Sequence, residues 1–583
     1  MKLTNIEIKN FRGIKHASVS FHQNSPIICL IGAGDSGKST LLTAIEWALW
    51  PSWSLIATDT DFYNCDTTSP IEITVSITEL PKVLIKEDKF GLYLRDFEKA
   101  FQGGDDEPTE TGTTILTIQL TIDDTLEPKW NVITSRTDPK PIPQKDRRLL
   151  SFGVVGFDHD KDFLWGRGSI LQKYADSKDV LHSAFTKAMR AAVENTSLEA
   201  LDQMAPALKN VGKQYGVGFN GEIHNKLLMQ NGAYSTTVGI FDDKVPFAQR
   251  GLGSKRLLSI GMNVNACDEG TLVLVDEVET GLEPYRISSL INQFRMQFKE
   301  HGQLIMTTHS RSVICECSVS ELCVTCNDAG ELKVHQLDKI NDICRDIQGI
   351  IRGEPDAFLC KRIIVCEGKT EIGLLRALDE KWLAERGTRF AHYGVGVALG
   401  GGGNKFFQLA RLLKECGYDC CILMDSDVAS EEAEKEAVEN LGIKVFSWEN
   451  GNAIEEQIFK DCSVQCAEQL IAYAVKIKGI QSIEAHLDNE FKNEAKEYSI
   501  KDETIILCGD EKGEVSIDVL CRIGKVAKGK KKKDQVEGAW FKRIDLGQEV
   551  GNIIFSSNEQ IDDGSHFKTI VNGIIDWVTN HEK

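Results

Sequence analysis

Residues 32–39 of this sequence place glycines, a lysine and a hydroxyl group in the order G-x-x-x-x-G-K-[ST], which is typical of a phosphate-binding loop. The glycines permit a tight turn whose backbone N–H groups face an anion, and the following helix directs its positive end at the same point. Lys38 would neutralise the β and γ phosphates, and the Ser39 hydroxyl would complete the shell of a Mg²⁺ ion. A plain turn between a strand and a helix is the alternative. We predict an ATP site with these cofactor-binding residues: Gly32, Gly34, Gly37, Lys38, Ser39 and Thr40.

Two carboxylates follow the apolar run over residues 271–275. This run is typical of a buried parallel strand. We predict that Asp276 belongs to the Mg²⁺ shell of the ATP site and that Glu277 orients an attacking water. The next strand, over 304–307, leads to His309, which we count among the catalytic candidates. Loops at the carboxyl ends of strands are where open α/β sheets bind nucleotides.

Four further carboxylates end two strands of a later β/α segment. Glu367 and Glu371 flank a strand-to-helix turn, while Asp425 and Asp427 follow another strand. Neighbouring parallel strands lie ~5 Å apart, so all four side chains could converge on one or two hard divalent cations. Clustered carboxylates repel one another without metal, so we interpret them as ligands rather than as a general acid-base pair. The alternative is an N-capping Asp and surface glutamates on an ordinary flavodoxin-like domain.

Apolar periodicity predicts the elements that position the first site. An alternating start over 2–9 delivers the chain to the strand before the loop, and a helical pattern over 40–50 follows the loop. Alternation over 71–78 and 114–122 predicts an antiparallel sheet layered beside the nucleotide-binding fold. Residues 170–212 are predicted to form a helical insertion between the two halves of the ATP site.

From Lys361 the pattern changes to strict β/α alternation, which positions the second site. Strands are predicted over 362–366, 395–399, 420–424 and 444–446, with helices between them.

The composition sets the class of protein. At 583 residues the chain is too long for one core, so two to four domains are expected. The 42% hydrophobic and 26% charged residues are typical of soluble globular proteins. No run reaches the length of a membrane span, and the chain opens on a strand pattern rather than a signal peptide. We expect a cytoplasmic protein without membrane contact.

The seventeen cysteines are scattered through apolar, strand-like runs. Without an export signal, a disulfide framework is not expected. Cys323 and Cys326 have the spacing of a zinc knuckle, but Cys315 and Cys317 are too close together for its other half. We therefore interpret these four as core residues.

The formal charge of −20 argues against a protein that coats nucleic acid non-specifically, because the mean field repels phosphate. Contact would need a local basic patch. Lysines concentrate over 525–533, followed by Trp540, Phe541, Lys542 and Arg543. A solvated loop is the alternative.

Arg12 in NFRG, the phosphate loop, RGLGSKRL, LVDEVETGLEP and THS occur in this order. Together they resemble the ATP-binding-cassette head of SMC, recombination-repair and OLD (overcoming lysogenization defect) proteins. The resemblance makes Arg12 a cofactor-binding residue and implies that two heads sandwich ATP. The loop from Gly251 to Ser254 of one subunit, with Gly253 and Ser254 as its cofactor-binding residues, would touch the γ-phosphate held by the other. This loop departs from the family's LSGGQ consensus. The short spacing from the insertion to the loop leaves no room for a long coiled coil, which favours the OLD branch.

The EGKTE segment at Glu367 and the DSD segment at Asp425 resemble the Toprim domain of topoisomerases, primases and OLD nucleases, in which EGxxE and DxD carry the metals. The resemblance implies metal-dependent cleavage of DNA under ATP control. It also suggests Glu455 as a further metal-side carboxylate and Lys542 as the lysine that completes the nuclease site. Both could equally be surface residues.

The predicted fold is α/β, an ABC-type (SMC/OLD-like) ATPase domain with a helical insertion, followed by a Toprim α/β domain. The domains are expected at 1–169 and 236–345 for the two parts of the ATPase, 170–235 for the helical insertion and candidate dimerisation element, and 346–583 for the Toprim domain with a C-terminal extension.

The predicted function is that of an ATP-regulated, divalent-metal-dependent DNA endonuclease in antiphage defence. An ATP-gated nucleic-acid clamp without cleavage, or a Toprim ribonuclease, are the alternatives. The expected cofactors are ATP and Mg²⁺, with Mn²⁺ or Ca²⁺ as alternatives at the Toprim site. The expected partners are DNA, further copies of the chain as a homodimer or higher homo-oligomer, and a defence protein such as a helicase-like protein or a retron reverse transcriptase with its DNA-RNA product.

Overall fold

The computed structural model describes residues 1–21, 25–52, 54–100, 106–109, 112–150, 152–156, 160–165, 171, 199–229, 236–265, 271–340, 346–428, 431–449, 451–491, 497–501, 504–509, 514–532, 535–557 and 559–580. These residues form two compact units. Unit 1 comprises Met1–Lys339 with Ile347–Arg352, and unit 2 comprises Ile340–Asp346 with Gly353–Lys583. The boundary predicted at residue 346 lies where the chain passes between the units.

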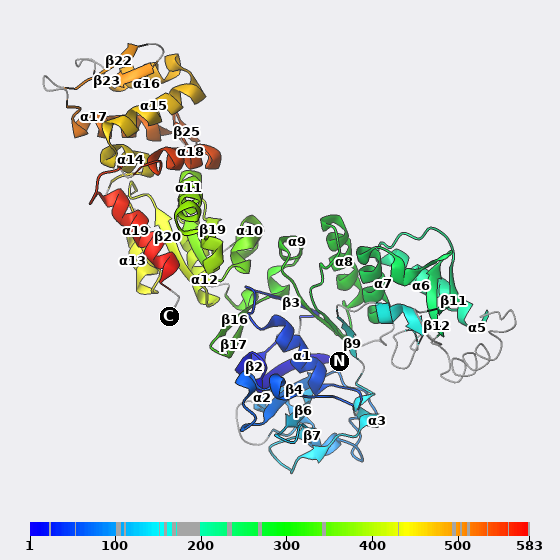
Figure 1. The fold of residues 1–583 in the computed structure, drawn as a ribbon. Coiled ribbons are helices and arrows are strands. Elements are labelled where there is room, and N and C mark those ends of the chain that lie inside the picture. The colour runs from blue at the N-terminus through cyan, green and yellow to red at the C-terminus, as the bar shows by residue number, and fades with distance from the viewer. Residues whose placement is uncertain are drawn as a thin grey trace. The chain divides into compact units, whose positions relative to one another are not determined.

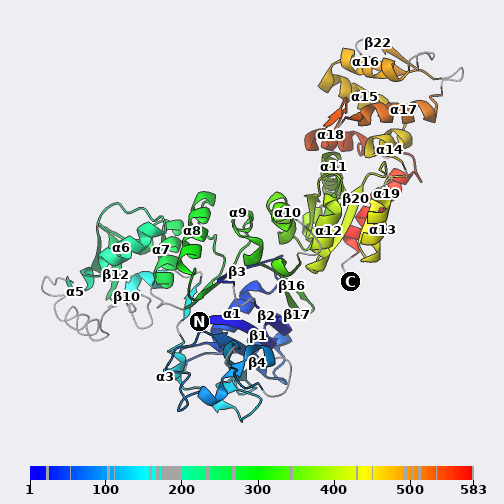
Figure 2. The same cartoon turned by 180° about the vertical axis from the view of Figure 1, so that it is seen from behind.

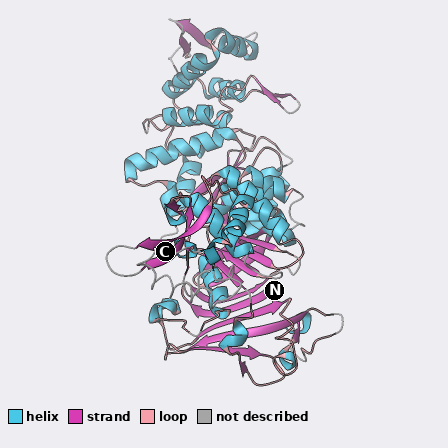
Figure 3. Cartoon of the chain, turned by 90° about the vertical axis from the view of Figure 1, so that its right-hand side faces the viewer, coloured by secondary structure: helices cyan, strands magenta, loops and turns pink. Residues whose placement is uncertain are grey.

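Unit 1 is built on one 13-stranded sheet in the order β8-β7-β6-β4-β1-β2-β17-β16-β3-β15-β14-β9, with β5 paired to β6. Figure 3, in which strands are magenta, shows these strands side by side. Their bounds are β1 Lys2–Phe11, β2 Ile14–Ser20, β3 Ile27–Ile31, β4 Ile71–Thr78, β5 Arg95–Asp96, β6 Thr114–Ile122, β7 Pro128–Ile133, β8 Lys140–Pro141, β9 Phe152–Val155, β14 Leu272–Val275, β15 Gln303–Thr307, β16 Leu322–Asp328 and β17 Glu331–Gln336.

The antiparallel strands belong to the same sheet as the nucleotide-binding strands, so the prediction of a separate layer is wrong. β2 pairs in parallel with β17 through Glu331↔His16 and Leu332↔Ala17. β17 in turn pairs with β16, which lies beside β3. The edge of the β1–β2 hairpin is therefore joined to the ATPase half by a hairpin that comes some 300 residues later, a pairing that local periodicity does not reveal.

Outside the insertion, the described helices of unit 1 are α1 Lys38–Ala48, α2 Phe97–Ala100, α3 Gln144–Arg147, α7 Leu252–Asn265, α8 Pro284–Gln297, α9 Arg311–Glu316 and α10 Ile347–Gly353. Of these, α1 lies against β4, β6 and β15 of the sheet, and α7 lies against β9 and β14 (Figure 1). α1 buries Leu41, Ala44 and Ile45 at spacings of three and four residues, which is the helical repeat of a core-facing stripe.

The insertion is helical only in part. Residues 172–198, where much of the helical prediction falls, lie outside the described residues. The described part contains α5 Glu199–Asp202 and α6 Ala205–Gln214, but also strand β11 Ile223–Met229. β11 pairs with β12 Thr236–Asp242 in a small sheet that includes β10 Leu164–Trp165 and β13 Val245–Pro246. Residues 223–229 are therefore not helical as predicted for 170–235, because a cross-strand partner decides their conformation.

Unit 2 begins with a four-stranded parallel sheet in the order β19-β18-β20-β21. The strands are β18 Arg362–Cys366, β19 Val395–Leu399, β20 Asp419–Met424 and β21 Lys444–Ser447, and the flanking helices are α11 Lys369–Arg386, α12 Lys405–Glu415, α13 Glu432–Asn440 and α19 His566–Thr579. The predicted strict β/α alternation is confirmed.

A helical extension follows the last strand of this sheet. Its elements are α14 Ile454–Asp461, α15 Val464–Lys478, α16 Ile480–Glu490, α17 Ile517–Lys528 and α18 Ile544–Ile554, with the hairpins β22 Tyr498–Lys501, β23 Thr504–Leu507 and β24 Lys530–Lys532, β25 Gln535–Glu537. Figures 1 and 2 show α15, α16 and α17 beyond α14 and α18, on the side away from β20.

α18 packs on α11 with direct backbone contact. A Cβ at Gly373 of α11 would lie 2.4 Å from Ile544 O, and one at Gly547 of α18 would lie 2.7 Å from Thr370 O. Glycine on both faces therefore allows the two helix starts to touch. Glu371 lies in the first turn of α11 and Lys542 lies just before α18, so this contact brings the two residues to one place.

The four cysteines considered for zinc lie in or near the core, as expected. Cys317 and Cys323 are buried, and Cys315 and Cys326 are partly buried. Within the described residues no helix is both long and apolar enough to span a membrane.

Candidate functional site

The phosphate loop joins β3 to α1, as predicted. Gly32 has φ +143°, and a Cβ there would lie 2.5 Å from Thr325 O of β16. Gly37 has φ +88°, a conformation that glycine adopts without strain. These two positions require glycine, so the local chain geometry supports a loop that curls its N–H groups around an anion.

Lys38 closes the loop on itself. Its Nζ donates to Gly32 O at 3.0 Å, Ala33 O at 2.7 Å and Ser36 Oγ at 3.1 Å. Burial lowers the pKa of Lys38 to about 8, against the pull of the nearby Asp276 carboxylate. The loop offers the buried ammonium of Lys38 only neutral oxygen acceptors. A bound phosphate would place a negative charge beside it.

The two predicted Mg²⁺ ligands of the ATP site lie together. Ser39 Oγ donates to Asp276 Oδ1 at 3.0 Å, although 237 residues separate them. Thr307 Oγ1 donates to the same oxygen at 2.6 Å and also accepts from Glu277 N at 2.8 Å. Thr307, which sequence reasoning missed, therefore orients the Asp276 carboxylate and holds the backbone of Glu277. Its place at the end of β15 was the available signal.

Glu277 occupies a strained backbone conformation with φ 46°. Arg256 of α7, which is fully buried, supports this turn by donating to Asp276 O, Glu277 O and Gly156 O. Burial lowers the pKa of Arg256 to about 10. This second missed residue lies within the RGLGSKRL segment and connects that segment to the carboxylates.

His309 is exposed, and its backbone N donates to Glu279 Oε1 at 2.7 Å. Thr308 Oγ1 donates to the other oxygen of Glu279 at 2.7 Å. Glu279, also missed from the sequence, thus anchors the segment that carries His309 beside the turn of Asp276 and Glu277.

Three predicted cofactor-binding residues lie outside the contacts of the loop. Gly253 and Ser254 lie in the first turn of α7, where a Cβ at Gly253 would meet Gly281 O at 2.4 Å. Arg12 pairs with Asp61 at 2.9 Å, and its guanidinium lies 5.3 Å from the ring of Trp47, near the end of α1 remote from the loop. Their contacts with ATP stay predictions.

The second site lies at the carboxyl ends of β18 and β20, which are neighbours in the sheet of unit 2. Glu367 directly follows β18, Glu371 lies in the first turn of α11, and Asp425 directly follows β20. Glu367 Oε2 accepts from Asp425 N at 3.0 Å, which joins the two strand ends. A Cβ at Gly368 would lie 2.7 Å from Glu371 Oε2, so the Glu371 carboxylate lies against the backbone of this turn.

Glu455 of α14 joins this group. Asp425 Oδ1 accepts from Ile454 N at 2.9 Å, which places the start of α14 at the end of β20. Glu455 is 1% exposed and Lys542 Nζ lies 3.1 Å from its Oε2. The two residues suggested by resemblance alone therefore contact each other, and neither is an isolated surface group.

The electrostatics of this group are those of crowded, desolvated acids. Burial and the neighbouring Asp425 raise the pKa of Glu367 to about 8. Burial raises the pKa of Glu371 to about 7 against the opposing effect of Lys542, and burial with the Glu371 charge raises the pKa of Asp425 far above its usual range. Without a further cation, the group holds more acids than its single lysine can neutralise.

Asp427 is placed differently from the other predicted ligands. Its Oδ2 lies 2.8 Å from Lys528 Nζ of α17, and Lys528 also contacts Glu456. As the side chains lie, no three Asp, Glu, His or Cys residues in the described part of the chain are grouped closely enough to hold one metal ion. The four predicted ligands share one end of the sheet, but Asp427 is held by a lysine.

The residues nevertheless fit a divalent metal. Within the described residues, the buried oxygens Glu371 Oε2 and Glu455 Oε1 accept no hydrogen bond. Leaving a buried carboxylate oxygen unpaired is costly, and a cation removes that cost. The donors are all carboxylate oxygens, which hard cations such as Mg²⁺, Mn²⁺ and Ca²⁺ prefer.

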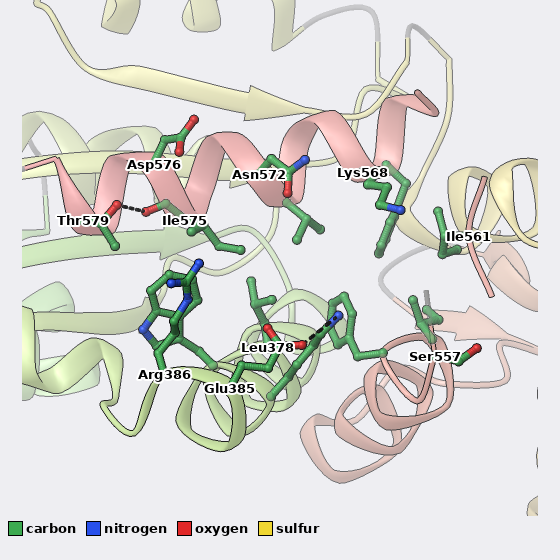
Figure 4. A pocket seen from close by; sticks show the side chains of 16 residues that line it. Leu378, Glu385, Arg386, Ser557, Ile561, Lys568, Asn572, Ile575, Asp576 and Thr579 are labelled. Carbon is green, nitrogen blue, oxygen red and sulfur yellow. Dashed lines mark hydrogen bonds and ion pairs between the residues drawn. The ribbon is translucent and has the colours of Figure 1, made fainter. Parts of the chain in front are cut away.

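A separate cavity of about 500 Å³ lies in unit 2 among α11, α19 and the end of α18 (Figure 4). Its lining combines apolar side chains with charged side chains of both signs. It contains none of the carboxylates described above; its lining includes Leu378, Glu385, Arg386, Lys568, Asn572 and Asp576.

Comparisons with family models also place ATPase domains ahead of a Toprim domain in the chain. Residues 1–132 match the model described as AAA ATPase domain, and residues 117–316 match AAA domain, putative AbiEii toxin, Type IV TA system. Residues 358–427 match Overcoming lysogenization defect protein-like, TOPRIM domain. This last match contains both strand ends of the second site.

Individual relatives were also found. The Old nuclease of Escherichia phage P2 is 21% identical over 473 residues, which cover 74% of this chain and 78% of the phage protein. The OLD nuclease of Thermus scotoductus is 37% identical over 76 residues, or 12% of this chain and 14% of that protein. Among solved structures, the SMC head domain from Thermotoga maritima is 13% identical with a TM-score of 0.30, covering 58% of this chain and 99% of that one.

The predicted α/β fold class, with an ATPase domain ahead of a Toprim domain, is therefore confirmed. The chain carries the domains of an ATPase and of a nuclease, and it has the ATPase-Toprim architecture of the OLD nucleases.

Proposed function

We propose that the protein is an ATP-regulated, divalent-metal-dependent DNA endonuclease. The observation that carries this proposal is the group formed by the buried Glu371, Asp425 and Glu455 with the half-buried Glu367, in which two carboxylate oxygens lack a hydrogen bond. Such an acid group is costly for folding and useful for holding a cation.

In the proposed reaction the residues of the second site divide into metal ligands and a lysine that stabilises charge. Glu367, Glu371, Asp425 and Glu455 would hold the divalent cation, and Asp427 would join them. A cation at this place polarises the scissile phosphate and makes a bound water more acidic. Lys542, held by Glu455, would stabilise the negative charge that develops on the phosphate oxygens in the transition state.

The ATP site would act as the control input. Lys38 would bind the phosphates, Ser39 and Asp276 would hold Mg²⁺, and Glu277 would orient the attacking water beside His309. Gly253 and Ser254 would engage ATP on a second copy of the chain, so the control would need a homodimer or higher oligomer. A ligand shifts only states that it binds differently, so ATP would act by favouring one arrangement of the paired heads.

The resemblance to OLD nucleases also supports a role in antiphage defence, with a helicase-like protein or a retron reverse transcriptase as partner. Co-purification of the native protein, followed by identification of bound protein and nucleic acid, tests this role. Recovery of the chain alone from infected cells would argue against a stable partner.

The test of cleavage uses purified full-length protein, supercoiled plasmid and Mg²⁺. Wild type should nick or linearise the plasmid, and the Asp425→Ala, Asp427→Ala double variant should not. The matched control replaces two exposed acids of α13, Glu436→Ala and Glu439→Ala, and should cleave like wild type. Full cleavage by the first double variant would refute the assignment; faster digestion of tRNA than of plasmid would make the substrate RNA.

A further inference from the structure

Lys528, the last residue of α17, lies between two carboxylates of unit 2. Its Nζ is 2.8 Å from Asp427 Oδ2 and 2.8 Å from Glu456 Oε2. Glu456 has a second role, because the same Oε2 accepts from Ala453 N at 2.9 Å at the start of α14. Glu456 is therefore a structural anchor for Lys528, while Asp427 belongs to the predicted metal ligands.

The position of Lys528 is set by backbone packing. A Cβ at Gly524 of α17 would lie 2.9 Å from Glu456 Cα and 3.2 Å from Glu455 O. α17 thus lies directly on α14, and Lys528 follows one helical turn after the contact. The ammonium group is held next to the acids by two packed helices, unlike a lysine on a free surface.

Lys528 also begins a basic surface. Gly529, with φ +80°, turns the chain into the β24–β25 hairpin, in which Lys530 pairs with Glu537 and Lys532 with Gln535. Residues 530–533 are four consecutive lysines, and the side chains of Lys525 and Lys530 are exposed. The whole chain has a net charge of −20, so this local concentration of positive charge is opposite in sign to the overall charge of the protein.

The aromatic residues predicted for this patch are not part of it. Trp540 and Phe541 are each 1% exposed, so neither ring is available to stack on a base. Among these described residues, the lysines offer charge while the two rings are buried, which suits contact with the phosphodiester backbone rather than with the bases.

Lys528 holds Asp427 through Oδ2, and with its side chain in this position Asp427 is not grouped with the other carboxylates closely enough to share one ion with them. A divalent cation at the strand ends attracts Asp427 more strongly than one ammonium does, and Lys528 then loses one of its two anions. A phosphate of a bound strand can replace that anion at the same place. We propose that Lys528 exchanges Asp427 for a backbone phosphate of DNA when metal binds, and that the exposed Lys530 continues this contact along the strand.

Metal and DNA would then bind cooperatively. A bound metal draws Asp427 away from Lys528 and frees Lys528 for a phosphate, and a bound phosphate holds Lys528 and frees Asp427 for the metal. The inference rests on the proposed function for its metal and its DNA. Lys528 is a substrate-binding residue in this scheme, so its test is a binding measurement that does not depend on cleavage.

The test is a double-mutant cycle measured by fluorescence anisotropy with a labelled 30-base-pair DNA, full-length protein, 0.1 M KCl and EDTA. Asp427→Asn frees Lys528 to neutralise one phosphate and should tighten DNA binding about eightfold. One neutralised phosphate contributes a slope of about −0.9 in log K against log salt, so at 0.1 M salt it raises K about eightfold over its value at 1 M. In the Lys528→Gln background, Asp427→Asn should change binding by less than about twofold.

Two further variants separate charge from folding. Lys528→Arg, which keeps the charge, should bind DNA like wild type. The matched control Lys476→Gln removes one exposed lysine from α15 of the same extension and should leave both affinity and salt slope unchanged. Isothermal titration of Mg²⁺ without DNA supplies a second readout, in which Lys528→Gln should bind Mg²⁺ more tightly because Asp427 has lost its competitor.

Equal gains from Asp427→Asn in both backgrounds would overturn the inference. So would a Lys528→Gln, Asp427→Asn double variant that keeps the affinity and salt slope of the Asp427→Asn single variant. These outcomes differ from failure of the proposed function. A wild type that cleaves nothing but shows the coupling supports Lys528 as a phosphate-binding residue, whereas a wild type that cleaves without the coupling refutes it.

Discussion

A single methyl group placed between α11 and α18 should test how the second site is positioned. In an unconstrained helix, replacing glycine by alanine is favourable by about 1 kcal/mol. At Gly373 of α11, however, the new Cβ would lie 2.4 Å from Ile544 O, 2.5 Å from Gln548 N and 2.6 Å from Gly547 C. All three are backbone atoms of α18, so no side-chain rotation can relieve the contact.

The size of the effect follows from these distances. Ordinary contact begins near 3.4 Å, so α18 must move away by roughly 1 Å. Overpacking of this kind costs about 1–3 kcal/mol, which exceeds the gain in helix propensity. Because Lys542 lies two residues before α18, the shift should also move it relative to Glu371 and Glu455 and lower cleavage on the order of 100-fold.

The assay compares Gly373→Ala with Gly353→Ala by thermal unfolding and by plasmid cleavage. Gly353 is the last residue of α10, and a Cβ there meets nothing within 4 Å. We expect Gly373→Ala to lower Tm by about 2–8 °C and Gly353→Ala to leave Tm and cleavage unchanged or slightly raised. A stabilised, fully active Gly373→Ala protein would show that the close contact of α11 and α18 does not position Lys542.

Three further changes address the two sites. Lys38→Ala should abolish ATP binding and change the ATP dependence of cleavage without removing cleavage itself; loss of cleavage under every nucleotide condition in a folded, assembled protein would make the loop part of the chemistry. Thr307→Val removes the hydroxyl that contacts Asp276 and Glu277 and should lower ATP hydrolysis 10- to 100-fold, measured by phosphate release, whereas Thr307→Ser should retain activity. EDTA should lower the Tm of the wild type, and Mg²⁺ at about 100 times its Kd should restore roughly 2.7 kcal/mol of unfolding free energy. Glu371→Gln should show a smaller Mg²⁺-dependent shift in Tm if that carboxylate holds the metal.

The local motifs were readable because their chemistry acts over a few residues. The turns at Gly32 and Gly37 need glycine for their own backbone angles, and Ser39 follows Lys38 on the same helix start. The β/α alternation after Lys361 likewise records which side chains each element buries. These constraints act between near neighbours in the chain, so periodicity and spacing carry them.

Contacts between distant segments followed from packing alone. The pairing of β2 with β17, the support of Glu277 by Arg256, and the hold of Lys528 on Asp427 each join residues that are well separated in sequence. No local pattern specifies such partners, because a lysine or an arginine has the same sequence signal in solvent and in an ion pair.

The sequence by itself therefore determined the ATP loop, the order of the two domains and the carboxylates at the strand ends. The tertiary structure decided which carboxylates are buried without a partner and which are held by lysines. The physical reason is that burial and ion pairing depend on how α11, α14, α17 and α18 pack together, and glycines at their contacts set that packing.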